Sequence, residues 1–126
     1  LGNVREFGIV FRALAIDGQW RRCLRLLQEM REAGLEPNIV TYNQVLSAMA
    51  KDKQVDRALA TLLEMREQSM EPDILSYSNC VGACKPAEWY RALQIMEDMR
   101  GAGLAPDGAC FEHAAAACEE AGEWQR

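Results

Sequence analysis

The fold is decided by residues 40–73, which read VTYNQVLSAMAKDKQVDRALATLLEMREQSMEPD. The closing dipeptide, Pro72-Asp73, recurs 35 residues earlier as Pro37-Asn38 and 34 residues later as Pro106-Asp107. A period of this length is too long for a heptad and too short for a domain, and it is typical of a two-helix unit that stacks on copies of itself. Three methionines keep the same two intervals: Met30, Met65 and Met99.

Each period contains two helical patterns. Residues 40–51 carry an apolar stripe at helical spacing, which indicates a packing face. A polar turn at 52–54 follows, and residues 55–68 carry a second stripe that ends before Pro72 breaks the helix. The repeating unit is therefore predicted to be helix, turn, helix. The two stripes comprise Tyr42, Val45, Leu46 and Met49, and then Val55, Ala58, Leu59, Leu62, Leu63 and Met65.

The period divides the chain into copies at 4–38, 39–73 and 74–107, with a partial copy at 108–126. We predict one all-α solenoid array over residues 1–126, with seven full helices and the start of an eighth. The first helices of the copies should form one layer and the second helices another.

Particular residues mark where helices should end. Gly34 and Gly103 follow the second helices of the first and third copies, where a left-handed cap is expected. The third copy is one residue short, and Pro86 should end its first helix early.

The composition fits a packed array. Hydrophobic residues make up 49% of the chain and charged residues 26%, which leaves no segment that is typical of disorder. No apolar run reaches the roughly 18 residues that span a bilayer, and residues 1–16 lack the basic start of a targeting signal. We expect no membrane span, and any targeting segment should lie outside this chain, which we interpret as part of a longer array.

The five cysteines are predicted to be structural. An odd number in a chain rich in helix formers argues against a disulfide framework and for a reducing compartment. Cys80 and Cys84 lie one helical turn apart, so a zinc site is the alternative, but such sites normally use a second cluster of ligands that the sequence lacks. We therefore predict no metal and no other cofactor.

No catalytic motif stands out. The lone histidine, His113, lies in the stretch FEHAAAAC. The sequence lacks the His-x-Glu and Cys-x2-Cys pair of the zinc deaminases. We predict that the chain is not an enzyme.

Four segments together resemble the pentatricopeptide repeat: VTYN at 40–43, VDRAL at 55–59, LLEMREQSMEPD at 62–73 and LLQEMREAGLEPN at 26–38. The likeness extends over essentially the whole chain. It implies a right-handed solenoid that binds single-stranded RNA at about one base per repeat. It also implies a role in RNA processing or expression in a mitochondrion or chloroplast.

A protein-binding scaffold of the tetratricopeptide kind is the alternative function. Those repeats share the length and the helix pair, but they typically have a Gly-x2-Tyr pair in the first helix, which the second copy lacks. They also lack the Pro-Asp ending.

The first helix of the second copy has a second face. Val40, Asn43, Ser47 and Lys51 fall at spacings of 3, 4 and 4, away from the apolar stripe. We expect this face to be free. It offers an apolar side chain to press on a base, an amide for a base edge, a hydroxyl, and a cation for phosphate.

The resemblance implies which residues would read bases. In the family, base choice is attributed chiefly to a polar residue near the start of the first helix together with the last residue of the motif. These positions carry Asn43 with Asp73 in the second copy and Ser78 with Asp107 in the third, which would favour uracil followed by guanine. The stacking positions carry Val40 and Leu75. The other reading positions depart from the pattern: Gly8 with Asn38 in the first copy, and Glu112 in the fourth.

The net charge of −5 argues against RNA, because phosphate neutralisation supplies much of nucleic-acid affinity. Many acids belong to second helices, however, away from the expected groove. The first helices contribute Arg5, Arg12, Lys51 and Lys85 against Glu6 and Glu112, which predicts a mildly positive groove. We predict phosphate contacts at Arg12, Lys51 and Lys85.

The terminal copies should present apolar faces that lack a neighbour. We therefore expect self-association through the ends of this segment. The residues concerned are Phe7, Phe11, Phe111 and Trp124.

Overall fold

The computed structural model describes residues 4–120, except for the side chains of Val4, Pro86, Ala109 and 117–120. This part of the chain is all α-helical, with seven α-helices, one short 3-10 helix and no strand, as predicted. The predicted start of an eighth helix and Trp124 lie outside the described residues. The helices are α1 (Val4–Ile16), α2 (Trp20–Glu32), α3 (Ile39–Lys51), α4 (Val55–Glu67), α5 (Ile74–Gly82), η1 (Pro86–Glu88), α6 (Trp89–Gly101) and α7 (Gly108–Glu120).

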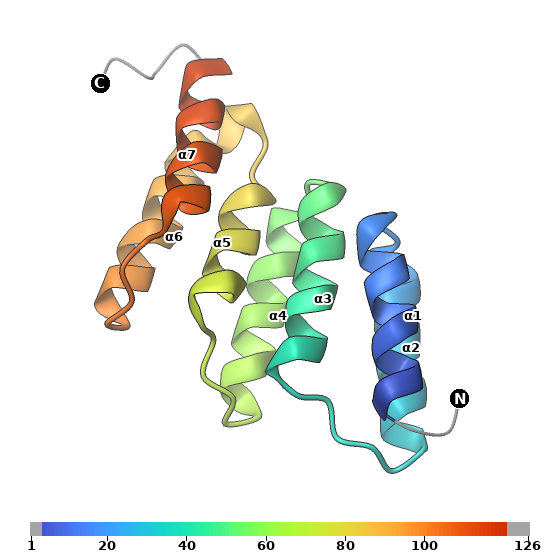
Figure 1. Cartoon of the computed structure of the whole chain (residues 1–126). Coiled ribbons are helices and arrows are strands. Elements are labelled where there is room, and N and C mark those ends of the chain that lie inside the picture. Colours follow the sequence, from blue (N-terminus) through green and yellow to red (C-terminus); the bar gives the residue numbers. More distant parts are fainter. Residues whose placement is uncertain (1–3, 121–126) are drawn as a thin grey trace.

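The helical hairpins stand side by side along the chain (Figure 1). The first helices pack on one another in the order α1, α3, α5, α7, whereas in the described residues the backbones of the second helices α2, α4 and α6 lie apart. The first helices are therefore the more closely spaced layer. An array spaced in this way curves toward that layer, and we call the surface of the layer the inner surface.

The predicted stripes form the core. Tyr42, Val45, Leu46 and Met49 are all buried, as are Met30, Met65 and Met99. The expectation that Phe7 and Phe11 lie on an unpaired end was wrong, because both are buried in the continuous core. α1 packs against α2 and α3 together, and these two helices cover its aromatic face. Phe111 is 52% exposed, as predicted.

The helix ends follow the sequence signals. Gly34 and Gly103 adopt φ of 80° and 84°, the left-handed conformation expected at these caps. Ser69 takes the corresponding place in the second copy with φ of 60°, although it is not a glycine. The first helix of the third copy, α5, has 9 residues where the other first helices have 13, and Pro86 begins η1 beyond it.

The described helices are all too short or too polar to cross a bilayer.

A recurring contact joins each hairpin to the next. Arg31 of α2 donates to the hydroxyl of Tyr42 in α3, and its guanidinium lies 6.0 Å from the ring centre. Arg66 of α4 does the same to Tyr77 in α5, at 5.6 Å from the ring centre. At the third junction the tyrosine position holds Phe111, and Arg100 instead donates to Glu97 at 3.3 Å. The third junction therefore lacks this hydrogen bond.

The substitutions Tyr42→Phe and Tyr77→Phe should each lower the free energy of unfolding by about 1 kcal/mol, the net value of one hydrogen bond. Phe111→Tyr should raise it by a smaller amount, because that ring is half exposed. Thermal melting followed by circular dichroism measures the three changes. Melting of Tyr77→Phe at the temperature of the unsubstituted chain would contradict this account.

The described cysteines are buried thiols. Cys80 donates to the carbonyl of Ala58 at 3.8 Å, and Cys84 donates to that of Cys80 at 3.7 Å. Burial raises the pKa of both to about 12 and that of Cys23 to about 11. In the described part of the chain, no three His, Cys, Asp or Glu side chains gather where they could hold a metal ion.

Because only the thiolate reacts with an alkylating agent, these raised pKa values predict slow reaction in the native protein. Iodoacetamide at pH 8 should label Cys23, Cys80 and Cys84 much more slowly in the folded chain than in urea. Peptide mass spectrometry reads each site separately. Equal rates in both states would show that these thiols are accessible.

Candidate nucleic-acid interface

The seam between α3 and α5 holds a cluster of polar side chains. Asn43 lies there, and its Nδ2 donates to Asp73 Oδ1 at 3.2 Å. Ser76 Oγ lies 2.6 Å from Asn43 Oδ1 and donates to it. The structure thus brings together Asn43 and Asp73, which are 30 residues apart in the chain.

Asn43 is less free than the sequence suggested. It is only 6% exposed and Ser78 only 4%, whereas Val40 and Lys51 are exposed as expected. The neighbouring first helix packs beside α3 and covers the turn that carries Asn43. Asn43 therefore lies at the bottom of a seam, with its amide held by protein partners.

The start of α5 fixes the position of Asp73. Asp73 is the N-cap residue, and its Oδ1 accepts from Ser76 N at 3.0 Å. Asp73 N donates in return to Ser76 Oγ at 3.1 Å. This is a capping box, which satisfies backbone donors that the first turn would otherwise leave unpaired. The carboxylate that holds Asn43 is therefore also part of the helix start.

A hollow of about 260 Å³ opens above Asn43 and Asp73. Its rim includes Val40 and Leu75, which are 61% and 55% exposed. Two exposed apolar side chains from neighbouring first helices, α3 and α5, thus flank the polar pair. The remaining lining residues are Ile39, Gln44, Ser47 and Asn79.

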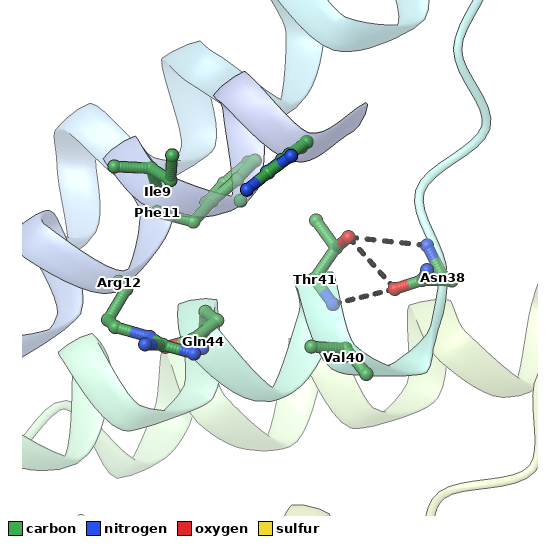
Figure 2. A pocket seen from close by; sticks show the side chains of 9 residues that line it. Ile9, Phe11, Arg12, Asn38, Val40, Thr41 and Gln44 are labelled. Carbon is green, nitrogen blue, oxygen red and sulfur yellow. Dashed lines mark hydrogen bonds between the residues drawn. The ribbon is translucent and has the colours of Figure 1, made fainter. Parts of the chain in front are cut away.

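A second hollow, of about 400 Å³, lies at the equivalent place between α1 and α3. Figure 2 shows Ile9 and Arg12 on one side and Asn38, Val40, Thr41 and Gln44 on the other. Its polar lining also includes Arg5, and Gly8 stands in the place of Asn43. Nothing lies within 4 Å of where a side chain of Gly8 would begin, and this hollow is the larger of the two. Asn38 caps α3 and accepts from Thr41 N at 3.0 Å.

The third seam is built from Ser78, Asp107 and Cys110. Asp107 Oδ1 accepts from Cys110 N at 3.0 Å at the start of α7. Burial raises the pKa of the Cys110 thiol. Asp107 thus accepts at the start of α7 as Asp73 does at the start of α5. Glu112 is exposed on α7.

The cations predicted for phosphate lie on the surface. Arg12 and Lys51 are exposed on first helices, and Lys85 is exposed just after α5. The acids Glu29, Glu32, Glu64, Glu67, Glu97 and Asp98 belong to the second helices, as predicted.

Sequence reasoning missed two members of the second seam. Ser76 holds Asn43, and Asn79 Nδ2 donates to the Asn43 carbonyl at 3.2 Å. A signal for Ser76 was present, because Thr41 stands 35 residues earlier with the same hydroxyl. A repeated hydroxyl three residues after the motif's end indicates a capping box.

These features define an α-solenoid of helical hairpins with polar clusters between its first helices. Two family models match the chain: one described as a pentatricopeptide repeat domain at residues 25–85, and one described as a PPR repeat at residues 7–35. Together they cover more than half of the 126 residues. The chain belongs to the pentatricopeptide repeat family.

Solved structures agree with this assignment. The pentatricopeptide repeat protein PPR10, in complex with an 18-nt psaJ RNA element, is 31% identical with a TM-score of 0.81. That alignment covers 94% of this chain but only 18% of PPR10. A structure of PPR10 from maize matches with a TM-score of 0.86 at 21% identity. That alignment covers 99% of this chain and 18% of the PPR10 chain, and it supports the fold. Comparison with curated protein sequences gave no match.

Proposed function

We propose that the chain binds single-stranded RNA along the inner surface, at about one base per hairpin, as part of a longer array. The observation that carries the proposal is the hollow where Asn43 and Asp73 lie hydrogen-bonded to each other below two exposed apolar side chains, Val40 and Leu75. Similarity to PPR10, whose complex with an RNA element is known, supports the same function.

In this proposal one base enters the hollow of the second copy. Val40 and Leu75 press on its two faces, a contact that any base accepts. The edge of the base meets Asn43, whose amide still has one N–H and one oxygen lone pair beyond the bonds to Asp73 and Ser76. A donor beside an acceptor matches the imide edge of uracil, so the second copy should prefer uracil.

The third copy should prefer guanine. The Ser78 hydroxyl can accept a hydrogen bond as well as donate one, so it can pair with a base edge that presents donors. The Watson–Crick edge of guanine presents two N–H donor groups. The same edge of uracil presents a single N–H donor between two acceptor oxygens. Arrays of this family are read parallel to RNA, so the preferred order is uracil and then guanine toward the 3′ end.

The phosphates would run past Arg12, Lys51 and Lys85. The net charge of −5 is unevenly placed relative to this path: the six acids named above belong to the second helices, whereas the first helices carry Glu6 and Glu112. Exposed charges farther apart than about 8–10 Å are largely screened at physiological salt. Family membership further supports a role in RNA processing or expression in a mitochondrion or chloroplast.

Base preference is the direct test. A chain labelled with nitrogen-15 is titrated with short RNAs that differ at one base, and the shifts of its amide signals give each affinity. Asn43→Thr and Asp73→Asn should each change the preferred base at the second copy, with the lost contact worth about 1 kcal/mol. The preference at the third copy should stay the same and serves as the internal control. If both variants kept the original preference, Asn43 and Asp73 would be ordinary structural residues.

The salt dependence tests the phosphate contacts. Lys51→Gln should weaken binding equally for all RNA sequences and reduce the slope of log affinity against log salt by about 0.7, the value for one phosphate contact on a single strand. Glu67→Gln, on α4, is the matched control and should leave both quantities unchanged. A sequence-dependent loss in Lys51→Gln would contradict this role.

A further inference from the structure

We propose that three side chains of this chain, and not two, form a base-reading unit. In the second copy they are Asn43, Asp73 and Ser76, which is the third residue of the following copy. Ser76 is a positioning residue that helps to determine the base specificity of Asn43. This inference rests on the proposed function and deepens it. It adds to the pair of positions that sequence resemblance provides.

The geometry of Ser76 leaves its hydroxyl one hydrogen to donate. Ser76 is fully buried, and its Oγ accepts from the backbone N of Asp73 at 3.1 Å. Two acceptors lie within reach of that hydrogen: Asn43 Oδ1 at 2.6 Å and Asp73 Oδ1 at 3.0 Å. The shorter contact is the stronger one, and Asp73 Oδ1 already accepts from Ser76 N and from Asn43 Nδ2. The hydrogen therefore goes to Asn43.

Together the two partners fix which way the Asn43 amide points. The ionised carboxylate of Asp73 can only accept, so it requires the NH₂ group of Asn43, while the Ser76 hydroxyl takes the oxygen. If the Asn43 amide were rotated by half a turn, its oxygen would face the Asp73 carboxylate, and two acceptors cannot form a hydrogen bond with each other. The second N–H and second lone pair of Asn43 are thereby given fixed places toward the hollow, and the order of donor and acceptor is what a base edge detects.

The other junctions show that the identity of this third residue matters. Thr41 occupies the place of Ser76 at the first junction, and because Gly8 offers no acceptor its hydroxyl turns to Asn38 Oδ1 at 3.0 Å. Cys110 occupies it at the third junction, where its sulfur lies 3.9 Å from Met99 Sδ. At the first two junctions, the hydroxyl of the third residue therefore bonds the reading side chain where one is present and stays on the helix cap where none is.

The test uses the same titration of the whole chain with RNAs that carry uracil or cytosine at the second position. Ser76→Ala should reduce the preference for uracil roughly fivefold, the effect of one lost hydrogen bond. It should also move the side-chain amide signals of Asn43 in the free protein. Ser76→Thr keeps the hydroxyl and should restore both.

Thr41→Ala is the matched control. Thr41 has the same role in the capping box of α3 as Ser76 has in α5, but no reading side chain faces it. Both alanine variants should therefore lose similar thermal stability, while only Ser76→Ala changes the base preference. Equal preference in Ser76→Ala and the unsubstituted chain would overturn the inference.

A gain of function provides a second test that does not depend on the stability of Ser76→Ala. The double substitution Gly8→Asn and Asn38→Asp supplies, beside Thr41, the two members of the base-reading unit that the first copy lacks. The hollow there has room for the new side chain at position 8. The double variant should acquire a uracil preference at the first copy, and Thr41→Val should abolish it. A preference that survives Thr41→Val would also overturn the inference. Failure of the unsubstituted chain to bind any RNA would overturn the proposed function and this inference together.

Discussion

The packing of first helices against one another is the contact on which the rest of the structure depends. It brings α3 and α5 close enough to bury Asn43 between them, and it leaves the backbones of the second helices apart. Only long side chains cross the outer gap, as in the ion pairs of Arg31 with Glu64 at 3.7 Å and of Arg91 with Asp56 at 2.5 Å. Such exposed pairs contribute little stability. The array is therefore held together by the first helices, which pack on one another and on the second helix of the preceding hairpin. The layer of first helices is also the layer that carries the hollows.

Asp73 belongs both to the fold and to the candidate site. As N-cap it starts α5, and as the partner of Asn43 it faces the hollow. Asn38 caps α3 with nearly the same backbone conformation, φ −116° and ψ −176° against −103° and −173° for Asp73. Asparagine and aspartate cap helices about equally well. The last residue of a copy can thus alternate between a neutral amide and a carboxylate without loss of the helix start, so under the proposed function the base preference would change while the fold stays the same.

The sequence predicted the architecture well because the period and the apolar stripes are local signals. The helices expected at 40–51 and 55–68 occur at Ile39–Lys51 and Val55–Glu67. The burial of Asn43 was not predicted. The apolar stripe of a helix shows which face packs within its own hairpin, but it does not show which face the next copy covers. The left-handed Ser69 was missed for a different reason: a serine at a cap leaves no signal comparable to glycine.

The shortened third copy shows how a deletion is accommodated without moving the site. α5 ends at Gly82, and Lys53 of the preceding turn donates to the Gly82 carbonyl at 2.8 Å, which satisfies an acceptor that a longer helix would have paired. Gly82 also has no side chain, and His113 of α7 fills that space, with its Nε2 3.2 Å from where a Cβ would lie. Both adjustments occur in the last turn of α5. Tyr77, one turn before it, remains 1% exposed and bonded to Arg66. The missing turn residue therefore alters α5 only after Ser78, and the first turns of the helix, which carry the candidate site, keep their place.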